Sequence, residues 1–199
     1  MTHSNTRSHS ASQFGARLIG AALIASFVAC SQTPPTKTTE RGGTDDPRDR
    51  AARYVLATAK AFRTAYTQAV VEHVKKSGVL AREEWMKDAH AVMLPAQFIQ
   101  AAGFEIKDFE LSLIGATPLY QANLPKTPAE AEALKEFAAH PDKKILTFAD
   151  GNQFKGLAAD FAIAQDCADC HNAHPQSPRR NFRQGDLMGA IIVRMPDAR

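Results

Sequence analysis

Three residues near the C-terminus form the clearest chemical pattern in this 199-residue chain. Cys167 and Cys170 stand three positions apart, and His171 follows directly. Two thiols at this spacing form thioethers with haem vinyl groups in c-type attachment, and the histidine behind them coordinates the iron. The motif therefore predicts one covalently bound haem c, with His171 as the proximal iron ligand.

Other uses of the cysteine pair fit the sequence less well. A thioredoxin-like redox pair would need a βαβ setting that the sequence does not indicate. A zinc site needs four ligands; His174 could supply one, but there is no second cysteine pair, so distant histidines would have to complete it. A structural disulfide across two intervening residues is disfavoured without a redox role. We expect haem.

The third cysteine, Cys30, ends a segment typical of an export signal. Arg7 and Arg17 precede an apolar run, residues 18–30, that is too short to span a bilayer as a helix. Residues 27–30, Phe-Val-Ala-Cys, resemble a bacterial lipobox, in which the cysteine is lipidated and becomes the new N-terminus. The alternative is an ordinary secretory signal with an unrelated cysteine. We expect a periplasmic protein anchored by lipid at Cys30, in the outer membrane.

The chain then divides into three parts. Residues 1–29 are the expected signal peptide, residues 30–50 a lipidated cysteine with a polar, Pro- and Gly-rich tether, and residues 51–199 one folded domain. Loss of the signal removes two arginines and no acid, so the formal charge falls from +3 to +1. Nothing in this nearly neutral chain suggests a nucleic-acid partner.

The pattern of elements favours an α+β fold. Asp46 and Pro47 suit the start of a long helix and Gly78 its end, and shorter helices are expected at 83–90, 95–102 and 127–137. Strand-like runs begin near residues 109, 143, 154 and 186. Strands that follow and flank helices, without βαβ alternation, favour an antiparallel sheet.

Two sets of side chains could surround a haem. The apolar stripe of the long helix runs through positions 55, 59, 62, 66, 69 and 73, which would turn His73 inward. A histidine on such a face is more often a core residue than a ligand. The aromatic candidates for the haem slot are Phe62, Tyr66, Phe98 and Phe161, although apolar residues at such spacing are more often plain core. The basic candidates for haem propionates or an acidic partner, which could equally be a solvated loop, are Arg179, Arg180 and Arg183.

Landmarks along the chain resemble a family of exported c-type haem proteins. They are Leu-Pro-Ala-x-Phe at 94–98, the haem motif, and Gly-Asp-x-x-Gly at 185–189, and the resemblance covers most of residues 52–196. The family is catalogued as a domain of unknown function; its members stand alone or form the extracytoplasmic sensor of histidine kinases. The resemblance implies a PAS-like α+β fold, with a long N-terminal helix, an antiparallel sheet and covalent haem in the core.

The resemblance also suggests a second iron ligand. Some members have a ligating cysteine where this chain has His73, so His73 is the expected distal ligand and the iron is expected to be low-spin with two histidines. Its competitors are His90, Met93 and Met188. A methionine would raise the reduction potential, whereas a second histidine would lower it.

These observations favour an electron carrier or redox sensor over an enzyme. A six-coordinate iron has no position for substrate, and no nucleophile with a partner base stands out. The expected partner is a redox protein or small redox species, with the membrane reached through the lipid. The alternative is a haem-based sensor whose distal site binds NO, CO or O₂.

Overall fold

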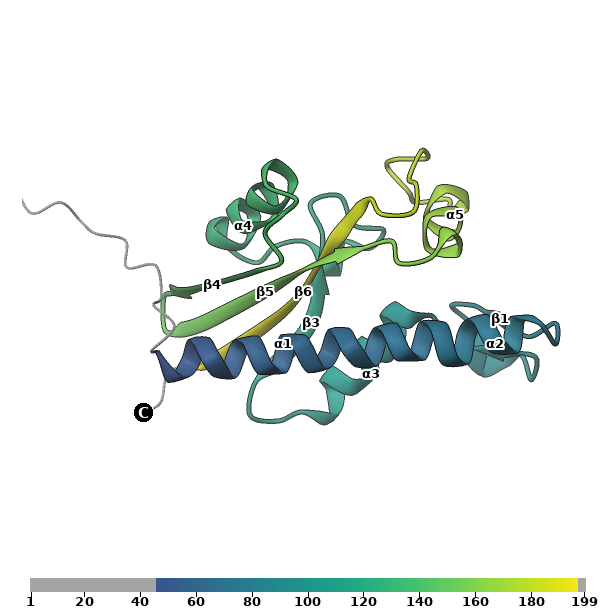
Figure 1. The fold of residues 1–199 in the computed structure, drawn as a ribbon, viewed down its shortest axis with the longest axis horizontal. Helices are drawn as coiled ribbons and strands as arrows, with labels where there is room; N and C mark the ends of the chain where they lie inside the picture. The colour runs from purple at the N-terminus through teal and green to yellow at the C-terminus, as the bar shows by residue number, and fades with distance from the viewer. Residues whose placement is uncertain (1–45, 197–199) are drawn as a thin grey trace, which may run out of the picture. The chain divides into compact units, whose positions relative to one another are not determined.

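The computed structural model describes residues 46–196, which lie within one compact unit. The expected signal peptide, Cys30 and most of the tether lie outside the described residues. The fold is α+β, as predicted: a four-stranded antiparallel sheet with helices on both faces (Figure 1). None of the described helices has both the length and the apolar character needed to cross a bilayer.

The long N-terminal helix begins where the sequence indicated. In α1 (Pro47–Ala65), the carboxylate of Asp46 caps the first turn by accepting from the Arg48 N–H at 2.8 Å, and proline occupies the first helical position. The helix continues as a π-helical segment, η1 (Tyr66–Val71), and ends in α2 (Glu72–Lys75). Gly78 follows with φ +83°, as expected for a helix stop.

The buried stripe of α1 differs from the predicted one. Its inward residues are Asp49, Ala52, Leu56, Ala59 and Arg63. The prediction that Phe62 faces inward was wrong, because its side chain is 62% exposed. The predicted stripe left out two charged residues, Asp49 and Arg63. Both are buried and have hydrogen-bonding partners on the sheet.

The sheet has the order β3-β6-β5-β4. Its strands are β3 (Glu110–Ile114), β4 (Ile145–Asp150), β5 (Gln153–Phe161) and β6 (Leu187–Pro196), all at segments that the sequence predicted. All three strand pairings are antiparallel. A separate parallel pair joins two very short strands, β1 (Leu80–Ala81) and β2 (Ala91–Val92). The helix expected at 83–90 is only a 3₁₀ turn, η2 (Trp85–Lys87).

Alternating side chains of the central strands build two cores. Ala158 and Ile191 face α1 and α3 (Pro95–Glu105), whereas Leu157 and Ile192 face α4 (Pro128–Ala139). Gly156 lets α1 approach the sheet, because a Cβ at this position would lie 2.9 Å from the Cβ of Ala52. Both faces of the sheet are therefore covered by helices.

The haem motif lies on its own helix beyond the end of β5. This helix, α5 (Gln165–Ala173), packs on a third apolar cluster that contains Ala162, Ala168 and Phe182. Between β5 and β6 the register shifts at Asp160 and Phe161, as in a β-bulge. Figure 1 shows α5 at the end of the sheet where α2 and β1 also lie. A remaining 3₁₀ turn, η3 (Gln121–Asn123), follows β3.

Candidate functional site: a cavity that faces the Cys-x-x-Cys-His helix

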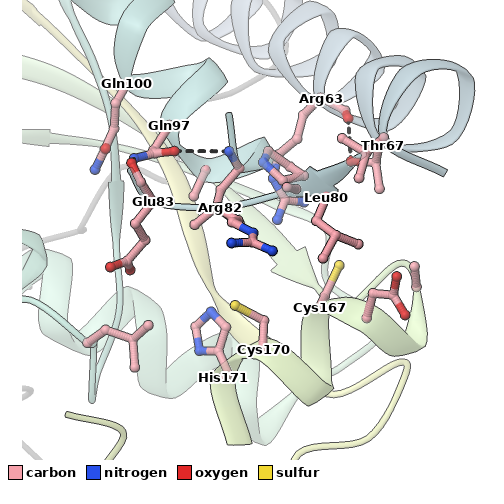
Figure 2. Close-up of a pocket in the computed structure, with 18 of the residues that line it drawn as sticks. Arg63, Thr67, Leu80, Arg82, Glu83, Gln97, Gln100, Cys167, Cys170 and His171 are labelled. Carbon is pink, nitrogen blue, oxygen red and sulfur yellow. Dashed lines mark hydrogen bonds between the residues drawn. The ribbon is translucent and has the colours of Figure 1, made fainter. Parts of the chain in front are cut away.

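A cavity of about 450 Å³ lies against α5, and all three motif side chains line it. Cys167, Cys170 and His171 form one wall, and Figure 2 shows them facing Leu80 and Arg82 across the cavity. The volume is within the usual range for cofactor and ligand pockets, roughly 300–1,000 Å³. The motif residues of α5 are thus brought to a single cavity.

The other walls come from segments far away in the sequence. The long helix supplies Arg63, Thr67 and Val71, and the start of α3 supplies Leu94, Pro95 and Ala96. These last three belong to the Leu-Pro-Ala-x-Phe landmark. Leu119 and Tyr120, from the connection between β3 and α4, complete the apolar part of the lining. Because residues 80–83 also line it, a flat apolar group entering this cavity would contact side chains from five segments.

A smaller cavity of about 90 Å³ adjoins the larger one, because the two share lining residues. Arg63, Cys167 and His171 line both cavities, while Asp160 and Met188 line only the smaller one. His171 therefore borders both cavities.

The cysteines are free thiols, and no disulfide joins them. Cys167 is half-buried, whereas Cys170 is exposed on the cavity side. Partial desolvation, followed by the nearby carboxylate of Glu83, raises the pKa of Cys170. The Cys170 thiol is therefore protonated at neutral pH. Among the described residues, no group of three or more His, Cys, Asp or Glu side chains could hold a metal ion.

The ring of His171 is held in place and is neutral at pH 7. Burial lowers its pKa, and the nearby His174 and Arg63 lower it further. Neutral imidazole is the form that binds metal. The ring meets Phe182 edge to face, with centroids 5.6 Å apart. Asn172 fastens α5 to the same loop, because its amide donates to Phe182 O at 2.9 Å and accepts from Phe182 N at 2.8 Å.

A polar cluster joins three segments at the rim of the larger cavity. The Tyr120 hydroxyl donates to Glu83 Oε1 at 2.7 Å, and His174 Nε2 lies 3.4 Å from the same oxygen. The hydrogen bond to Glu83, together with desolvation, raises the pKa of Tyr120 to about 12. A second link, between Lys75 Nζ and Asp166 at 2.5 Å, joins α2 to α5. The two walls of the cavity are thus connected by hydrogen bonds.

The structure does not bring His73 to the cavity. Its side chain is exposed on α2, while its neighbours Val71, Glu72 and Lys75 line the cavity. The inward orientation predicted for His73 was therefore wrong. The physical reason lies first in α1, where the buried face runs through Arg63 rather than Phe62, so the predicted stripe was about one residue out of phase. The π-helical segment η1 then shifts the helical phase by about one residue more. The role of His73 as a ligand stays a prediction.

The competing ligands are also placed away from the larger cavity. His90 is exposed, and Met93 is half-buried with its carbonyl accepting from the Tyr66 hydroxyl at 2.8 Å. Met188 lines the smaller cavity together with His171. Within the described part of the chain, no histidine, cysteine or methionine outside the motif lines the larger cavity.

The aromatic and basic candidates lie outside the lining of the larger cavity. None of Phe62, Tyr66, Phe98 and Phe161 lines the larger cavity. Tyr66 and Phe98 stack on each other with centroids 4.6 Å apart. The basic loop folds on itself: Arg179 pairs with Asp186 at 2.6 Å, and Arg180 donates to the carbonyl of Asn172.

Sequence reasoning missed Arg63, Thr67, Arg82 and Tyr120, which line the cavity. Arg63 and Thr67 are four positions apart on one face of the long helix, and that spacing was the signal available. Arg82 and Tyr120 stand in irregular segments whose positions no periodicity indicates.

Comparisons with known proteins place the chain in one family. The model of the family described as Tll0287-like matches residues 41–196. Among solved structures, the crystal structure of the cyanobacterial heme-protein Tll0287 matches with a TM-score of 0.44 and 17% sequence identity, over 52% of this chain and 70% of that chain. A comparison with curated proteins gave no match.

Proposed function

The chain belongs to the Tll0287-like family, and from this premise we propose that it is a monohaem c-type protein that carries or senses electrons. Cys167 and Cys170 would hold the haem covalently, and His171 would bind its iron. The observation that carries the proposal is that these three side chains line one cavity of about 450 Å³. A bound haem would supply a reversible one-electron couple.

The residues around the motif suit this task. Leu80, Leu94 and Pro95 provide apolar contact opposite α5. Phe182 and Asn172 fix the orientation of α5, so the thiols and the imidazole approach a single group from one side. This preorganisation favours ligation because little side-chain freedom remains to be lost.

The cellular setting belongs to the same proposal. The export-type segment and Cys30 support a periplasmic, lipid-anchored protein of the outer membrane whose partner is a redox protein or a small redox species. We propose a carrier or sensor without enzymatic activity. His73 is the candidate for the second axial position, on the condition that its helix rotates, since its side chain is exposed here.

A second function is favoured by one specific observation. Within the described residues, the larger cavity has no His, Cys or Met beyond the motif. An iron held by His171 alone would keep a coordination position free for a small ligand. Such a protein would bind NO, CO or O₂ and act as a gas sensor.

Two measurements on the purified full-length protein test both functions. Mass spectrometry after denaturation, on protein from cells competent in c-type maturation, should show one added haem, which a Cys167→Ala/Cys170→Ala variant should lack. A chain mass without haem would refute the proposal. Optical spectra of the reduced protein with CO then separate the two functions: an unchanged low-spin spectrum supports the carrier or redox sensor, and immediate CO uptake supports the gas sensor.

A further inference from the structure

Arg63 has a buried hydrogen-bond donor that no described residue satisfies. The residue is only 8% exposed, and its Nε has no hydrogen-bond partner. Figure 2 shows the side chain extending from α1 toward the larger cavity, and Arg63 lines both cavities. A buried donor without a partner costs about 1–3 kcal/mol, so a native structure normally provides it with an acceptor.

The existing partner of Arg63 leaves one edge of the guanidinium available. Nη1 donates to Asp160 Oδ1 at 2.7 Å, and this is the only hydrogen bond of the group among the described residues. Nε and Nη2 lie on the same edge of a guanidinium and point in parallel. This edge matches the two oxygens of a carboxylate, which accepts two parallel N–H bonds.

The charges around Arg63 favour one more anion. Lys60 lies on the same helix and donates to the carbonyl of Ala159 at 3.0 Å, so the cluster has two cations and the single carboxylate of Asp160. Burial raises the pKa of Asp160, although Arg63 and Lys60 oppose this effect. Burial lowers the pKa of Lys60, Asp160 opposes this effect, and Lys144 is a further cation near Lys60. With Arg63, Lys60 and Asp160 all charged, the cluster has one more positive than negative charge.

We propose that the Nε and Nη2 edge of Arg63 is a carboxylate-binding site in the wall of the cavity beside His171. The carboxylate has two possible sources: a propionate of the proposed haem, or a free carboxylate that enters from solution. The first source rests on the proposed function, whereas the second does not. Arg63 would in both cases bind the anion while Asp160 holds the guanidinium in place.

The test compares Arg63→Gln with wild type in the full-length protein. Arg63→Lys keeps the charge but loses the paired donors. Arg63→Gln alone leaves the buried carboxylate of Asp160 without its charged partner and could misfold. The double variant Arg63→Gln/Asp160→Asn removes that carboxylate charge as well, so it keeps the test open. Arg53→Gln is the matched control: Arg53 lies on the same helix and pairs with the buried Asp49 at 2.8 Å, but does not line either cavity.

Two readouts distinguish the sources. Resonance Raman spectra report the propionate bending bands, and a titration with acetate, followed by the melting temperature, reports a free carboxylate. If a haem propionate lies at Arg63, Arg63→Gln should show shifted propionate bands. Its reduction potential should also be lower, since a cation near the haem favours the reduced form. Wild type should then bind no acetate. A free carboxylate predicts unchanged bands and acetate binding that is about tenfold weaker in Arg63→Gln.

The outcomes also separate this inference from the proposed function. If the purified chain lacks covalent haem, the proposed function fails, and the acetate titration of that chain still decides whether Arg63 binds a carboxylate. If neither the bands nor acetate binding respond to Arg63→Gln, or if Arg53→Gln produces the same changes, the inference is overturned. Arg63 would then serve only to neutralise Asp160.

Discussion

At the scale of single residues, the rim of the cavity depends on one phenol. Tyr120 is 43% exposed, yet its hydroxyl is bonded to Glu83 and lies 3.4 Å from His174 Nε2. Glu83 and His174 are 37 and 54 positions away from Tyr120 in the sequence. This contact therefore reports whether the cavity has its folded shape.

We expect the Tyr120 phenol to titrate near pH 12 rather than near its ordinary value of about 10. Because the folded pKa is raised, the stabilisation from this bond is complete below about pH 10 and is lost as the pH rises through about 12. The measurement is the ultraviolet phenolate absorbance of wild type minus Tyr120→Phe. Glu83→Gln should move the titration midpoint of this absorbance difference back toward pH 10. Tyr54→Phe is the control, from an exposed site on α1. A Tyr120 signal centred near pH 10 in wild type would contradict the prediction.

At the scale of elements, the π-helical segment sets the direction of the second half of the long helix. An α-helix turns 100° per residue, and a π-helical turn holds about one residue more. η1 therefore rotates α2 by about one residue position relative to α1. In a regular α-helix, His73 would lie about 100° from its present direction and closer to the face that contains Arg63 and Thr67.

We expect that binding of His73 to iron requires η1 to relax into a regular α-helix. Deletion of Ala69 removes one residue from η1, so it should give a regular helix that keeps His73 outside. If His73 binds iron in this way, the wild-type full-length protein should be low-spin in both redox states. The His73→Ala variant and the Ala69 deletion should both be high-spin and bind CO readily. Optical and electron paramagnetic resonance spectra measure this, with Val70→Ala as a control of unchanged length. Identical spectra for all four proteins would exclude His73 as a ligand.

At the scale of the whole domain, a buried ion network attaches α4 to the sheet. Glu130 on α4 is fully buried and accepts from Lys155 Nζ at 2.8 Å and from Arg194 Nε at 2.7 Å. Lys155 belongs to β5 and Arg194 to β6, and both are 2% exposed. Burial alone would raise the pKa of Glu130, but the hydrogen bonds from Arg194 and Lys155 prevail and lower it to about 2.

Glu130→Gln should destabilise the domain by about 3–5 kcal/mol at pH 7, because two buried cations lose a charged partner. The folded pKa is depressed, so the stabilisation by Glu130 is complete above about pH 4.5 and is lost as the pH falls through about 2. The difference in the free energy of unfolding between wild type and Glu130→Gln should therefore be smaller at pH 3 than at pH 7. Urea unfolding at both pH values measures it.

The control for this prediction is Glu132→Gln on the same helix. Glu132 pairs with Lys135 at 3.1 Å on the surface, with about 73% of its side chain exposed. We expect a change within about 0.5 kcal/mol at either pH. An effect of Glu130→Gln as small as that of the control would mean that the network does not attach α4.

The sequence by itself determined the spacing of the motif residues and most of the elements, because both depend on residues that are close in the chain. The Cys167, Cys170 and His171 spacing, the start of the long helix at Asp46 and the four strands are local patterns. The family resemblance added the Leu-Pro-Ala landmark, which lines the same cavity as the motif.

Only the tertiary structure decided which side chains meet at the cavity. The outward position of His73 depends on which face of α1 packs on the sheet, the one with Arg63 rather than Phe62, and on the further turn that the π-helical segment adds. The inward position of Arg63 depends on Asp160, which is 97 residues away and supplies the partner that makes burial of a guanidinium tolerable. Helical periodicity ranks residues by apolarity, so it assigns charged residues to the surface. The free energy of a buried charge instead depends on a partner that only the fold brings near.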